Sequence, residues 1–237
     1  MKSLSVIIPV YNEASVIENV IESTYNEIIK KHGNAELLIF EDGSTDGTKQ
    51  ILGKFSARPK IKVFSGDAKK GYFNALKDAL RVPRSDMIFF MDSDDTLNPA
   101  DFWKLLEYAG DYDIVAGVRK RREDPAYRKV LSLFYNGLIW IMFGLRTRDS
   151  NVGFKILKRE IADEIVPEIK YLKYGFSTEL MARALHKGRK IKFVEISHAK
   201  RKSGKAEDFQ FGKIPKVVYR QLRGMLKLKA EMLFGSR

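Results

Sequence analysis

The sequence predicts an α/β fold in which a mostly parallel sheet is flanked by helices. Short apolar runs of strand length alternate with stretches of helical periodicity through the first half of the chain. One of these runs, Met87–Met91, is so apolar that both of its faces must be covered. Such alternation is typical of parallel sheets, because a helix usually forms the crossover between parallel strands. In these sheets ligands bind beyond the carboxyl ends of the strands, where we expect the functional site.

Seven strands are expected, each a short apolar run: Leu4–Pro9, Leu37–Phe40, Ile61–Phe64, Met87–Met91, Ile114–Val118, Val152–Leu157 and Ile191–Ile196. The first helix is expected from Ala14 to about Gly33, with Asn12 as its cap. The later helices are expected over Thr48–Phe55, Tyr72–Arg81, Asp101–Ala109, Tyr127–Phe143 and Ser177–His186, and from Phe209 onward. The helix over Tyr127–Phe143 is amphipathic and rich in aromatic residues.

The organisation expected is one catalytic domain over residues 1–208 and a basic, amphipathic helical extension over 209–237. No repeat, low-complexity stretch or Gly/Ser-rich linker divides the 237 residues, and no signal peptide is recognised. The least polar stretch, Val130–Leu145, has 16 residues. A bilayer crossing needs about 20, so we expect a buried helix or one that lies in the membrane interface.

Composition limits the chemistry. The chain has no Cys and three scattered His, which excludes disulfides, thiol nucleophiles and Cys-ligated metals and leaves oxygen ligands for any cation. Residues 187–237 hold 15 basic and 4 acidic side chains, whereas the first 186 hold 28 and 26. This asymmetry indicates contact with an anionic surface, either lipid headgroups or nucleic acid. A solvated basic face that aids solubility is the alternative.

Polar clusters follow three of the expected strands: Pro9–Glu13, Glu41–Thr48 and Asp92–Asp95. A turn and a helix cap at Ser44 or Asp46 explain part of the second cluster, but not its two adjacent acids. In the third cluster, two carboxylates two residues apart would repel each other unless a cation lay between them. Mg²⁺ and Mn²⁺ prefer such oxygen ligands.

Other metal and phosphate motifs do not match. A Ca²⁺ EF-hand requires Gly at the sixth loop position, where Leu97 stands. The motifs G-x-x-x-x-G-K-[ST] and G-x-G-x-x-G are absent from the sequence. A bound nucleotide diphosphate would therefore be neutralised by the cation and by Arg or Lys side chains.

Several segments resemble family 2 glycosyltransferases of the Rossmann-like GT-A fold: S-V-I-I-P-V-Y-N-E at 5–13, E-D-G-S-T-D-G-T at 41–48 and D-S-D at 92–94. Later segments resemble dolichyl-phosphate mannose synthases and related polyprenyl-phosphate sugar transferases. These are I-V-A-G-V-R at 114–119, the pair Arg128 and Ser132, D-S-N-V-G-F-K at 149–155, and R-K-S-G at 201–204. The resemblance covers about residues 4–210.

The resemblance implies roles for individual residues. The nucleotide would contact Pro9, Tyr11, Glu13, Phe40, Asp42, Asp92, Ser93 and Lys205; Asp92 and Asp94 would hold Mg²⁺ or Mn²⁺; and Asp94, Arg119, Arg128, Ser132 and Arg201 would act in transfer. The family often has Gln as a third metal ligand where Thr96 stands, so the third ligand here is expected to be either Asp95 or Thr96. Ala206 and Glu207 replace the family's usual Ser-Lys, so a sugar other than mannose is an open alternative.

The expected reaction is inverting transfer of a sugar, mannose or glucose, from a GDP- or UDP-sugar to a polyprenyl (dolichyl) phosphate. The side chains of Arg119, Arg128 and Arg201 would orient the acceptor phosphate and the leaving diphosphate, because a guanidinium group can bind a phosphate through two hydrogen bonds. A phosphate acceptor needs no strong base; Glu179 could act as one for a hydroxyl acceptor, or be an ordinary helix-surface carboxylate. We expect a cytoplasmic protein, peripheral on the inner face of the cell membrane, with no nucleic-acid partner.

Two alternatives remain. The run D-S-D-D-T at 92–96, after an apolar strand, also resembles haloacid dehalogenase-type phosphatases. Asp92 would then be the phosphorylated nucleophile and Asp94 the acid/base, with Mg²⁺. This leaves the clusters after the first two strands unexplained. The second alternative is a non-enzymatic, basic nucleic-acid or membrane-binding module, which the acidic strand ends do not favour.

Overall fold

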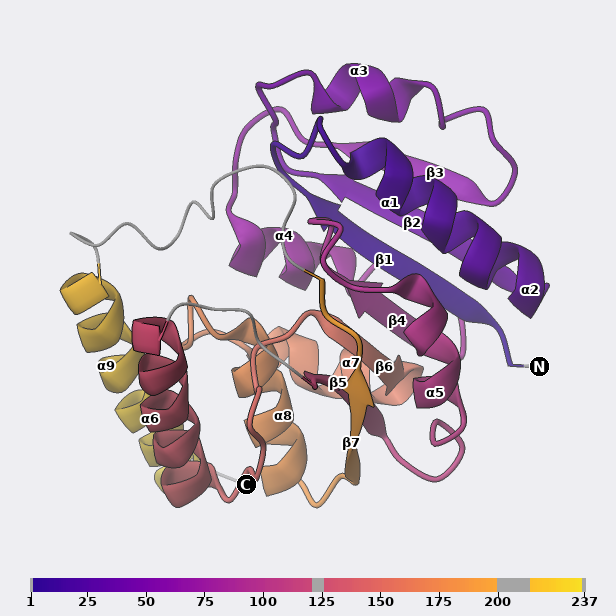
Figure 1. Ribbon diagram of the computed structural model, residues 1–237. Helices are drawn as coiled ribbons and strands as arrows, with labels where there is room; N and C mark the ends of the chain where they lie inside the picture. The colour runs from indigo at the N-terminus through magenta and orange to yellow at the C-terminus, as the bar shows by residue number, and fades with distance from the viewer. Residues whose placement is uncertain (1, 121–125, 200–213, 236–237) are drawn as a thin grey trace.

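The computed structural model describes residues 2–120, 126–199 and 214–235, which form a seven-stranded sheet between helices (Figure 1). The strand order is β3-β2-β1-β4-β6-β5-β7. The strands are β1 (Leu4–Val10), β2 (Ala35–Glu41), β3 (Ile61–Ser65), β4 (Met87–Met91), β5 (Ile114–Arg119), β6 (Phe154–Lys158) and β7 (Ile191–Ile196). All seven runs expected from the sequence are strands.

The sheet is mostly parallel, as predicted. β1 pairs in parallel with β2 and β4, β2 with β3, and β5 with β7, whereas β6 runs antiparallel to both of its neighbours. The chain builds outward from β1 to β3 and then returns to place β4 on the other side of β1. The strand order therefore reverses between β1 and β4, and ligands bind at such a reversal.

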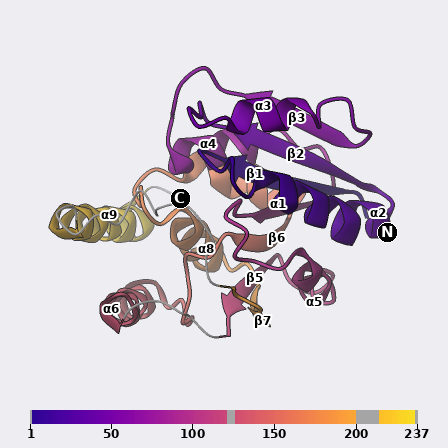
Figure 2. The same cartoon turned by 45° about the horizontal axis from the view of Figure 1, so that its top comes forward.

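Helices cover both faces of the sheet (Figure 2). Buried side chains of α1 (Ile17–Thr24), α3 (Thr48–Gly53) and α5 (Phe102–Leu106) pack into one apolar core. Those of α4 (Tyr72–Ala79), α7 (Arg159–Ile165) and α8 (Phe176–His186) pack into a second core on the opposite face. The remaining short elements are the π-helical turn Tyr25–Ile29, α2 (Lys30–His32) and the 3₁₀ turns Pro99–Asp101 and Val166–Glu168.

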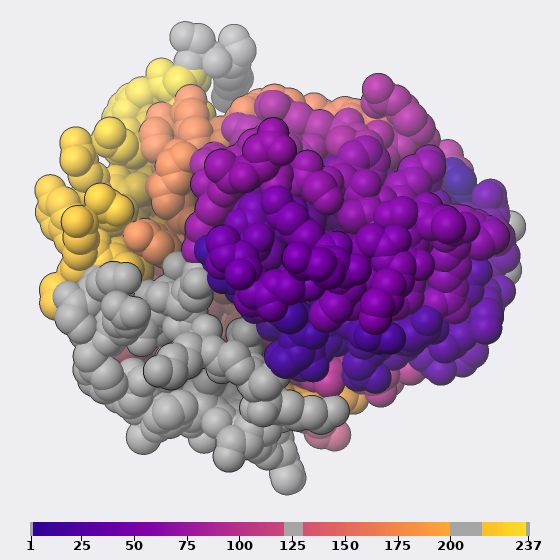
Figure 3. All heavy atoms as spheres, turned by 90° about the horizontal axis from the view of Figure 1, so that it is seen from above, coloured from indigo at the N-terminus to yellow at the C-terminus, as the bar shows by residue number. Residues whose placement is uncertain are grey.

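The two longest helices, α6 (Ala126–Phe143) and α9 (Ile214–Phe234), lie side by side at one edge of the molecule (Figure 1). A third core joins them to α8 and β5 and fully buries Met225 and Leu228 of α9. Seen from above, α9 and the N-terminal half of the chain form opposite sides of the molecule (Figure 3). Within the described ranges, no helix is long and apolar enough to cross a membrane.

Three local expectations differ from the structure. Asn12 does not cap the first helix: it has a φ of 53°, its Oδ1 accepts a hydrogen bond from the Thr45 N–H, and α1 begins only at Ile17. The sixth strand begins at Phe154 rather than Val152, because Gly153 turns toward β4. α7 (Arg159–Ile165) was not predicted from sequence, because its charged residues obscure its apolar spacing.

Candidate active site

Asp92 follows β4 directly and is held by two other segments of the chain. The Tyr72 hydroxyl, at the start of α4, donates to Asp92 Oδ1 at 2.9 Å, and the Gly153 N–H donates to Oδ2 at 3.0 Å. A Cβ atom at Gly153 would lie 2.1 Å from Asp92 Oδ1, so only glycine fits there. The glycine of the G-F-K segment therefore allows the close approach that orients Asp92.

The electrostatics of Asp92 fit a cation. Burial and the neighbouring Asp94 carboxylate raise the pKa of Asp92 to about 6, although hydrogen bonds from Tyr72 and Gly153 act in the opposite direction. A divalent cation between two such acids relieves both the burial cost and the repulsion. β4 ends at Met91, so both acids lie in the turn after the strand rather than alternating along it. These residues fit a site for Mg²⁺ or Mn²⁺.

The neighbouring oxygens of this turn have other contacts. Thr96 Oγ1 donates to Asp94 Oδ1 at 2.7 Å, and Asp95, with a φ of 57°, accepts from Asn19 Nδ2 at 2.8 Å. Ser93, which lies between Asp92 and Asp94 in the sequence, is buried. Among the described residues, no group of three His, Asp or Glu side chains is arranged to hold a metal. Water and a diphosphate are the other oxygen ligands that such a cation commonly takes.

At the ends of β1 and β2, Asp42 holds a loop. Its carboxylate accepts the backbone N–H groups of Lys70 and Gly71, each at 2.8 Å. Gly43, with a φ of 76°, lies so close to Ala68 that a Cβ atom would be 2.6 Å from its carbonyl carbon. Asp42 thus fixes the loop at Lys70 and Gly71 beside the reversal in strand order.

Other residues predicted to bind the nucleotide lie at or near the ends of β1 and β2. Lys69 Nζ is 3.8 Å from the centroid of the Tyr11 ring. Glu13 is buried, and its backbone N–H donates to Thr48 Oγ1 at 3.0 Å. Pro9 pairs with Phe40 between β1 and β2, and the Phe40 ring stacks on Phe64 with 4.6 Å between centroids. Phe40 therefore packs within the sheet layer, and its contact with a nucleotide stays a prediction.

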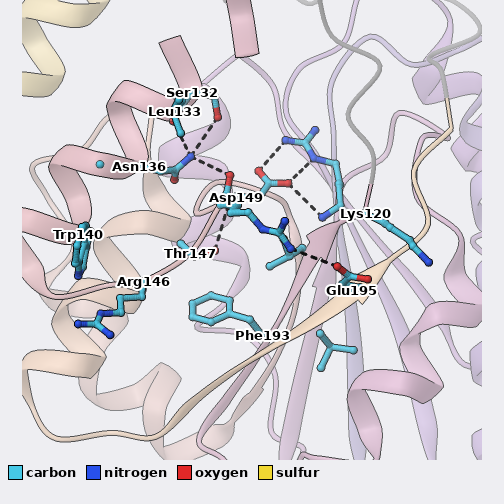
Figure 4. Close-up of a pocket in the computed structure, with 15 residues that line it drawn as sticks. Lys120, Ser132, Leu133, Asn136, Trp140, Arg146, Thr147, Asp149, Phe193 and Glu195 are labelled. Carbon is cyan, nitrogen blue, oxygen red and sulfur yellow. Dashed lines mark hydrogen bonds and ion pairs between the residues drawn. The ribbon is translucent and has the colours of Figure 1, made fainter. Parts of the chain in front are cut away.

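Arg119, at the end of β5, forms a bidentate ion pair with Asp149 (Figure 4). The Nε–Oδ2 and Nη2–Oδ1 distances are 2.6 and 2.8 Å, and Asp149 is 3% exposed. Truncation of one partner of so buried a pair typically costs about 3–5 kcal/mol, because the other charge stays buried without it. The pair therefore fixes the Asp149 loop as well as presenting a guanidinium to the site.

Asn136 of α6 fixes the other side of this loop. Its Nδ2 donates to the Arg148 carbonyl at 3.0 Å, and its Oδ1 accepts from Ser150 Oγ at 2.8 Å. Nδ2 also contacts Ser132 one turn earlier, at 2.7 Å from the carbonyl. Asn136 was not assigned a role from sequence, although an amide residue within an aromatic-rich helix was a visible signal.

Lys155 is fully buried in β6 between β4 and β5. Burial lowers its pKa to about 8, against the attraction of Asp149 and Asp92. Its Nζ donates to the Val152 carbonyl in the loop that ends at Gly153. The loop 149–153 thus contacts Arg119 at one end and Asp92 at the other. Lys155 contacts the loop between these two ends, at the Val152 carbonyl.

Two cavities flank α6 and share Arg119, Ser132, Asn136 and Asp149. The larger, about 1330 Å³, lies between α6, the segment 146–149 and β7 (Figure 4). The smaller, about 450 Å³, lies between α6 and α9. Its apolar wall comprises Leu131, Phe134, Leu138, Val217, Val218, Leu222 and Met225. Each cavity has an apolar wall that meets the same polar cluster.

The structure thus brings most of the predicted residues to one edge of the sheet. The Arg128 side chain, Arg201 and Lys205 lie outside the described residues, so their roles stay predictions. Tyr72, Gly153 and Lys155 were not assigned roles from sequence, because their contacts arise from packing between distant segments.

Glu179 is neither a surface residue nor placed like a base. It is 0% exposed and accepts the backbone N–H groups of Lys170, Tyr171 and Leu172 at 2.9, 2.8 and 2.7 Å. Arg183 donates to the same carboxylate at 3.0 Å. The surface-carboxylate expectation is therefore wrong, and Glu179 organises the loop before α8.

A family model described as "Glycosyl transferase family 2" matches residues 5–166. The chain belongs to glycosyl transferase family 2. The matched residues include the three polar clusters that follow β1, β2 and β4. The family therefore accounts for the two clusters that the phosphatase alternative left unexplained. Neither the phosphatase nor the non-enzymatic binding module is favoured.

The chain is also similar to curated proteins, at less than 30% identity. The chain is 29% identical over 197 residues to glycosyltransferase AglD of Haloferax volcanii, covering 79% of this chain and 32% of that protein. It is 26% identical over 222 residues to the undecaprenyl-phosphate 4-deoxy-4-formamido-L-arabinose transferase of Pectobacterium atrosepticum, covering 92% of this chain and 66% of that one. The chain thus spans about a third and just under two thirds of these relatives.

Solved structures confirm the GT-A fold. Glucosyl-3-phosphoglycerate synthase from Mycobacterium tuberculosis, crystallised with Mn²⁺, UDP and phosphoglyceric acid, matches with a TM-score of 0.70 at 18% identity, over 96% of this chain and 78% of that one. Mannosyl-3-phosphoglycerate synthase from Rubrobacter xylanophilus matches with a TM-score of 0.64 at 17% identity, over 95% and 73%. Another structure of the mycobacterial enzyme contains Mg²⁺ and UDP.

Proposed function

We propose that this enzyme transfers a sugar from a GDP- or UDP-sugar to a polyprenyl phosphate. One observation carries the proposal: the loop 149–153 links an apolar groove to the acids after β4. At Asp149 the loop pairs with Arg119, which lines the groove between α6 and α9, and at Gly153 it holds Asp92. An apolar groove that ends at a guanidinium suits an isoprenoid chain with a phosphate head.

The donor is proposed to bind at the ends of β1, β2 and β4. Asp92 and Asp94 are the residues that would hold Mg²⁺ or Mn²⁺, which supplies neutralisation of the donor diphosphate and Lewis acidity toward the leaving group. Tyr11, Glu13 and Asp42 follow β1 and β2 beside the reversal in strand order, where the nucleoside is expected. The relatives named for polyprenyl phosphates, and the neighbours holding UDP with a metal, support both halves of the proposal.

The acceptor phosphate is proposed to contact Arg119 and Ser132, with Arg128 and Arg201 as further cations from the sequence pattern. An oxygen of that phosphate attacks the anomeric carbon, the bond from this carbon to the diphosphate oxygen breaks, and its electrons leave with the nucleoside diphosphate. In-line attack inverts the anomeric centre. The phosphate oxygen is already anionic near neutral pH, so no side chain has to remove a proton.

Membrane association is proposed for the face formed by α6 and α9. Large apolar side chains are exposed there, among them Leu133 (76%), Ile141 (77%), Leu226 (65%) and Phe234 (84%). α9 also carries Lys216, Arg220, Arg223, Lys227 and Lys229. Amphipathic helices with cations beside apolar residues bind anionic membrane surfaces.

A transfer assay in detergent tests the proposal. Radiolabelled GDP- and UDP-sugars would be incubated with undecaprenyl phosphate and Mn²⁺, and the lipid product extracted. We expect product from one donor, and Leu222→Gln, in the groove wall, should raise the KM for the lipid about tenfold, since burial of one leucine is worth roughly 1.5 kcal/mol or more. Leu226→Gln, one turn away and outside the groove lining, should leave this KM unchanged. No lipid product from any donor would refute the proposal.

A further inference from the structure

The larger cavity extends beyond the proposed acceptor site. It shares Arg119 and Ser132 with the α6–α9 groove, but the rest of it lies on the other side of α6, and α9 does not line it. Its wall is mostly apolar and includes Leu133 and Trp140 of α6 and Phe193 of β7, which Figure 4 shows around one hollow. Its volume of about 1330 Å³ exceeds that of a typical small-ligand pocket, which is roughly 300–1,000 Å³.

The charge at this cavity is positive. Four basic side chains and two acidic ones line it: Arg119, Lys120, Arg146, Arg148, Asp149 and Glu195. Arg119 is neutralised by Asp149, whereas Arg148 meets Glu195 only at 3.4 Å, with side chains 85% and 53% exposed. In the described ranges, no carboxylate forms an ion pair with Lys120 or Arg146. An exposed pair such as Arg148–Glu195 contributes little, so the rim can accept an anion.

The charged rim and the apolar wall of the cavity meet at Trp140. The Arg146 guanidinium lies 5.3 Å from the centroid of the Trp140 ring, and Trp140 is 50% exposed. A half-exposed tryptophan beside a cation is typical of a membrane–water interface, where the ring contacts acyl chains and the cation contacts headgroups. Leu133, which also lines the cavity, is 76% exposed on the same helix. The cavity is therefore continuous with the proposed membrane-facing side of α6.

We propose that this cavity binds an anionic phospholipid of the membrane, separately from the acceptor. The headgroup lies at the rim that carries Lys120, Arg146 and Arg148, and the proximal acyl carbons pack on Leu133, Trp140 and Phe193. The net positive charge of the rim selects an anionic lipid over a zwitterionic one, and the apolar wall selects a lipid over a soluble phosphate. Binding there would hold α6 and the loop 146–149 against the membrane surface, next to the Arg119–Asp149 pair.

The test uses the fluorescence of Trp140 in the full chain. Dihexanoyl phosphatidylglycerol, kept below its micellar concentration, is titrated into the protein; we expect a saturable change in emission that is absent in Trp140→Phe. Arg146→Gln/Arg148→Gln should raise the Kd about twenty-fivefold, since each cation near an anionic lipid contributes about fivefold. The matched control, Lys30→Gln/Lys31→Gln on α2, removes the same charge at a distance and should leave the Kd unchanged.

Three results would overturn the proposal. Equal binding of dihexanoyl phosphatidylcholine would show only an apolar surface, and equal binding of inorganic phosphate would show a soluble-anion site. Displacement by undecaprenyl phosphate, or a raised KM for it in Arg146→Gln/Arg148→Gln, would assign the cavity to the acceptor. Because the transfer assay in detergent needs no phospholipid, unchanged transfer by this variant separates failure of the lipid site from failure of the proposed function.

Discussion

The hydroxyl of Tyr72 donates a hydrogen bond to the carboxylate of Asp92, with 2.9 Å between the two oxygens. Tyr72 is the first residue of α4, and Asp92 is the first residue after β4. The contact therefore joins a helix on one face of the sheet to the acid at the reversal in strand order. Together with the Gly153 N–H, it fixes the direction in which both carboxylate oxygens point.

Tyr72→Phe should weaken metal-dependent nucleotide binding about tenfold. Groups that hydrogen-bond to metal ligands typically change metal affinity by about 10–100-fold when removed. The measurement is a calorimetric titration of Mn²⁺ into protein in the presence of excess nucleotide. Tyr219→Phe, on the exposed side of α9, is the control. An unaltered Mn²⁺ affinity in Tyr72→Phe would show that Tyr72 does not position Asp92.

Gly153→Ala should abolish metal-dependent nucleotide binding. The added Cβ would lie 2.1 Å from Asp92 Oδ1, so either the acid or the loop 149–153 must move. Gly53→Ala is the matched control, because no atom lies within 4 Å of its added Cβ. Calorimetry and thermal unfolding of both variants would measure the effect. Wild-type nucleotide affinity in Gly153→Ala would mean that the close approach to Asp92 is unimportant.

Lys155 should make stability rise with pH in the alkaline range. Burial lowers its pKa from 10.5 to about 8, so between these values the unfolded chain binds more protons than the folded one. Raising the pH through this window therefore favours the folded state. The free energy of unfolding of wild type minus that of Lys155→Met should increase from pH 8 to 10 in urea titrations. A difference independent of pH would indicate an ordinary pKa for Lys155.

Glu231 should attach α9 to the rest of the enzyme. It accepts from Arg183 at 3.0 Å and Lys170 at 2.7 Å, and also bonds the Tyr171 hydroxyl. Glu231→Gln should lower the free energy of unfolding by about 1.5–3 kcal/mol, the range for hydrogen bonds to a charged group. Glu195→Gln, at an exposed pair, should change it by less than about 0.5 kcal/mol. Equal effects of the two variants would contradict this assignment.

The same residue predicts an acid-side pH dependence. Burial alone would raise the pKa of Glu231, but hydrogen bonds from Lys170, Tyr171 and Arg183 outweigh it and lower the pKa from 4.5 to about 2. The stabilisation is therefore present above pH 4.5 and is lost as the pH falls toward 2. The stability difference between wild type and Glu231→Gln should shrink over this window; a constant difference would exclude the mechanism.

The sequence predicted all seven strands and the edge of the sheet that carries the acids. This succeeded because buried strands are apolar throughout and polar residues such as Asp92 follow them directly. The strand order was not predictable, since β6 inserts antiparallel between β4 and β5 through contacts distant in sequence. The prediction that Asn12 caps the first helix was wrong, because its side chain accepts a hydrogen bond from the Thr45 N–H in a separate segment of the chain.

Contacts between site residues that are far apart in the sequence were also not predictable. Tyr72 and Asp92 are 20 residues apart, and Arg119 and Asp149 are 30 apart. Nothing local marks such pairs, whereas Asp92 and Asp94 are marked by their spacing. The buried positions of Lys155 and Glu179 depend on strand order and helix docking, which only the assembled fold defines.

Calorimetric titration of GDP and of UDP, each with and without Mn²⁺, tests the donor site most directly. The account predicts that one nucleotide binds, that Mn²⁺ is required, and that Asp92→Ala and Asp94→Ala each remove the metal-dependent part. Binding that ignores Mn²⁺, or that persists in both variants, would contradict the assignment of these two acids as the centre of the active site.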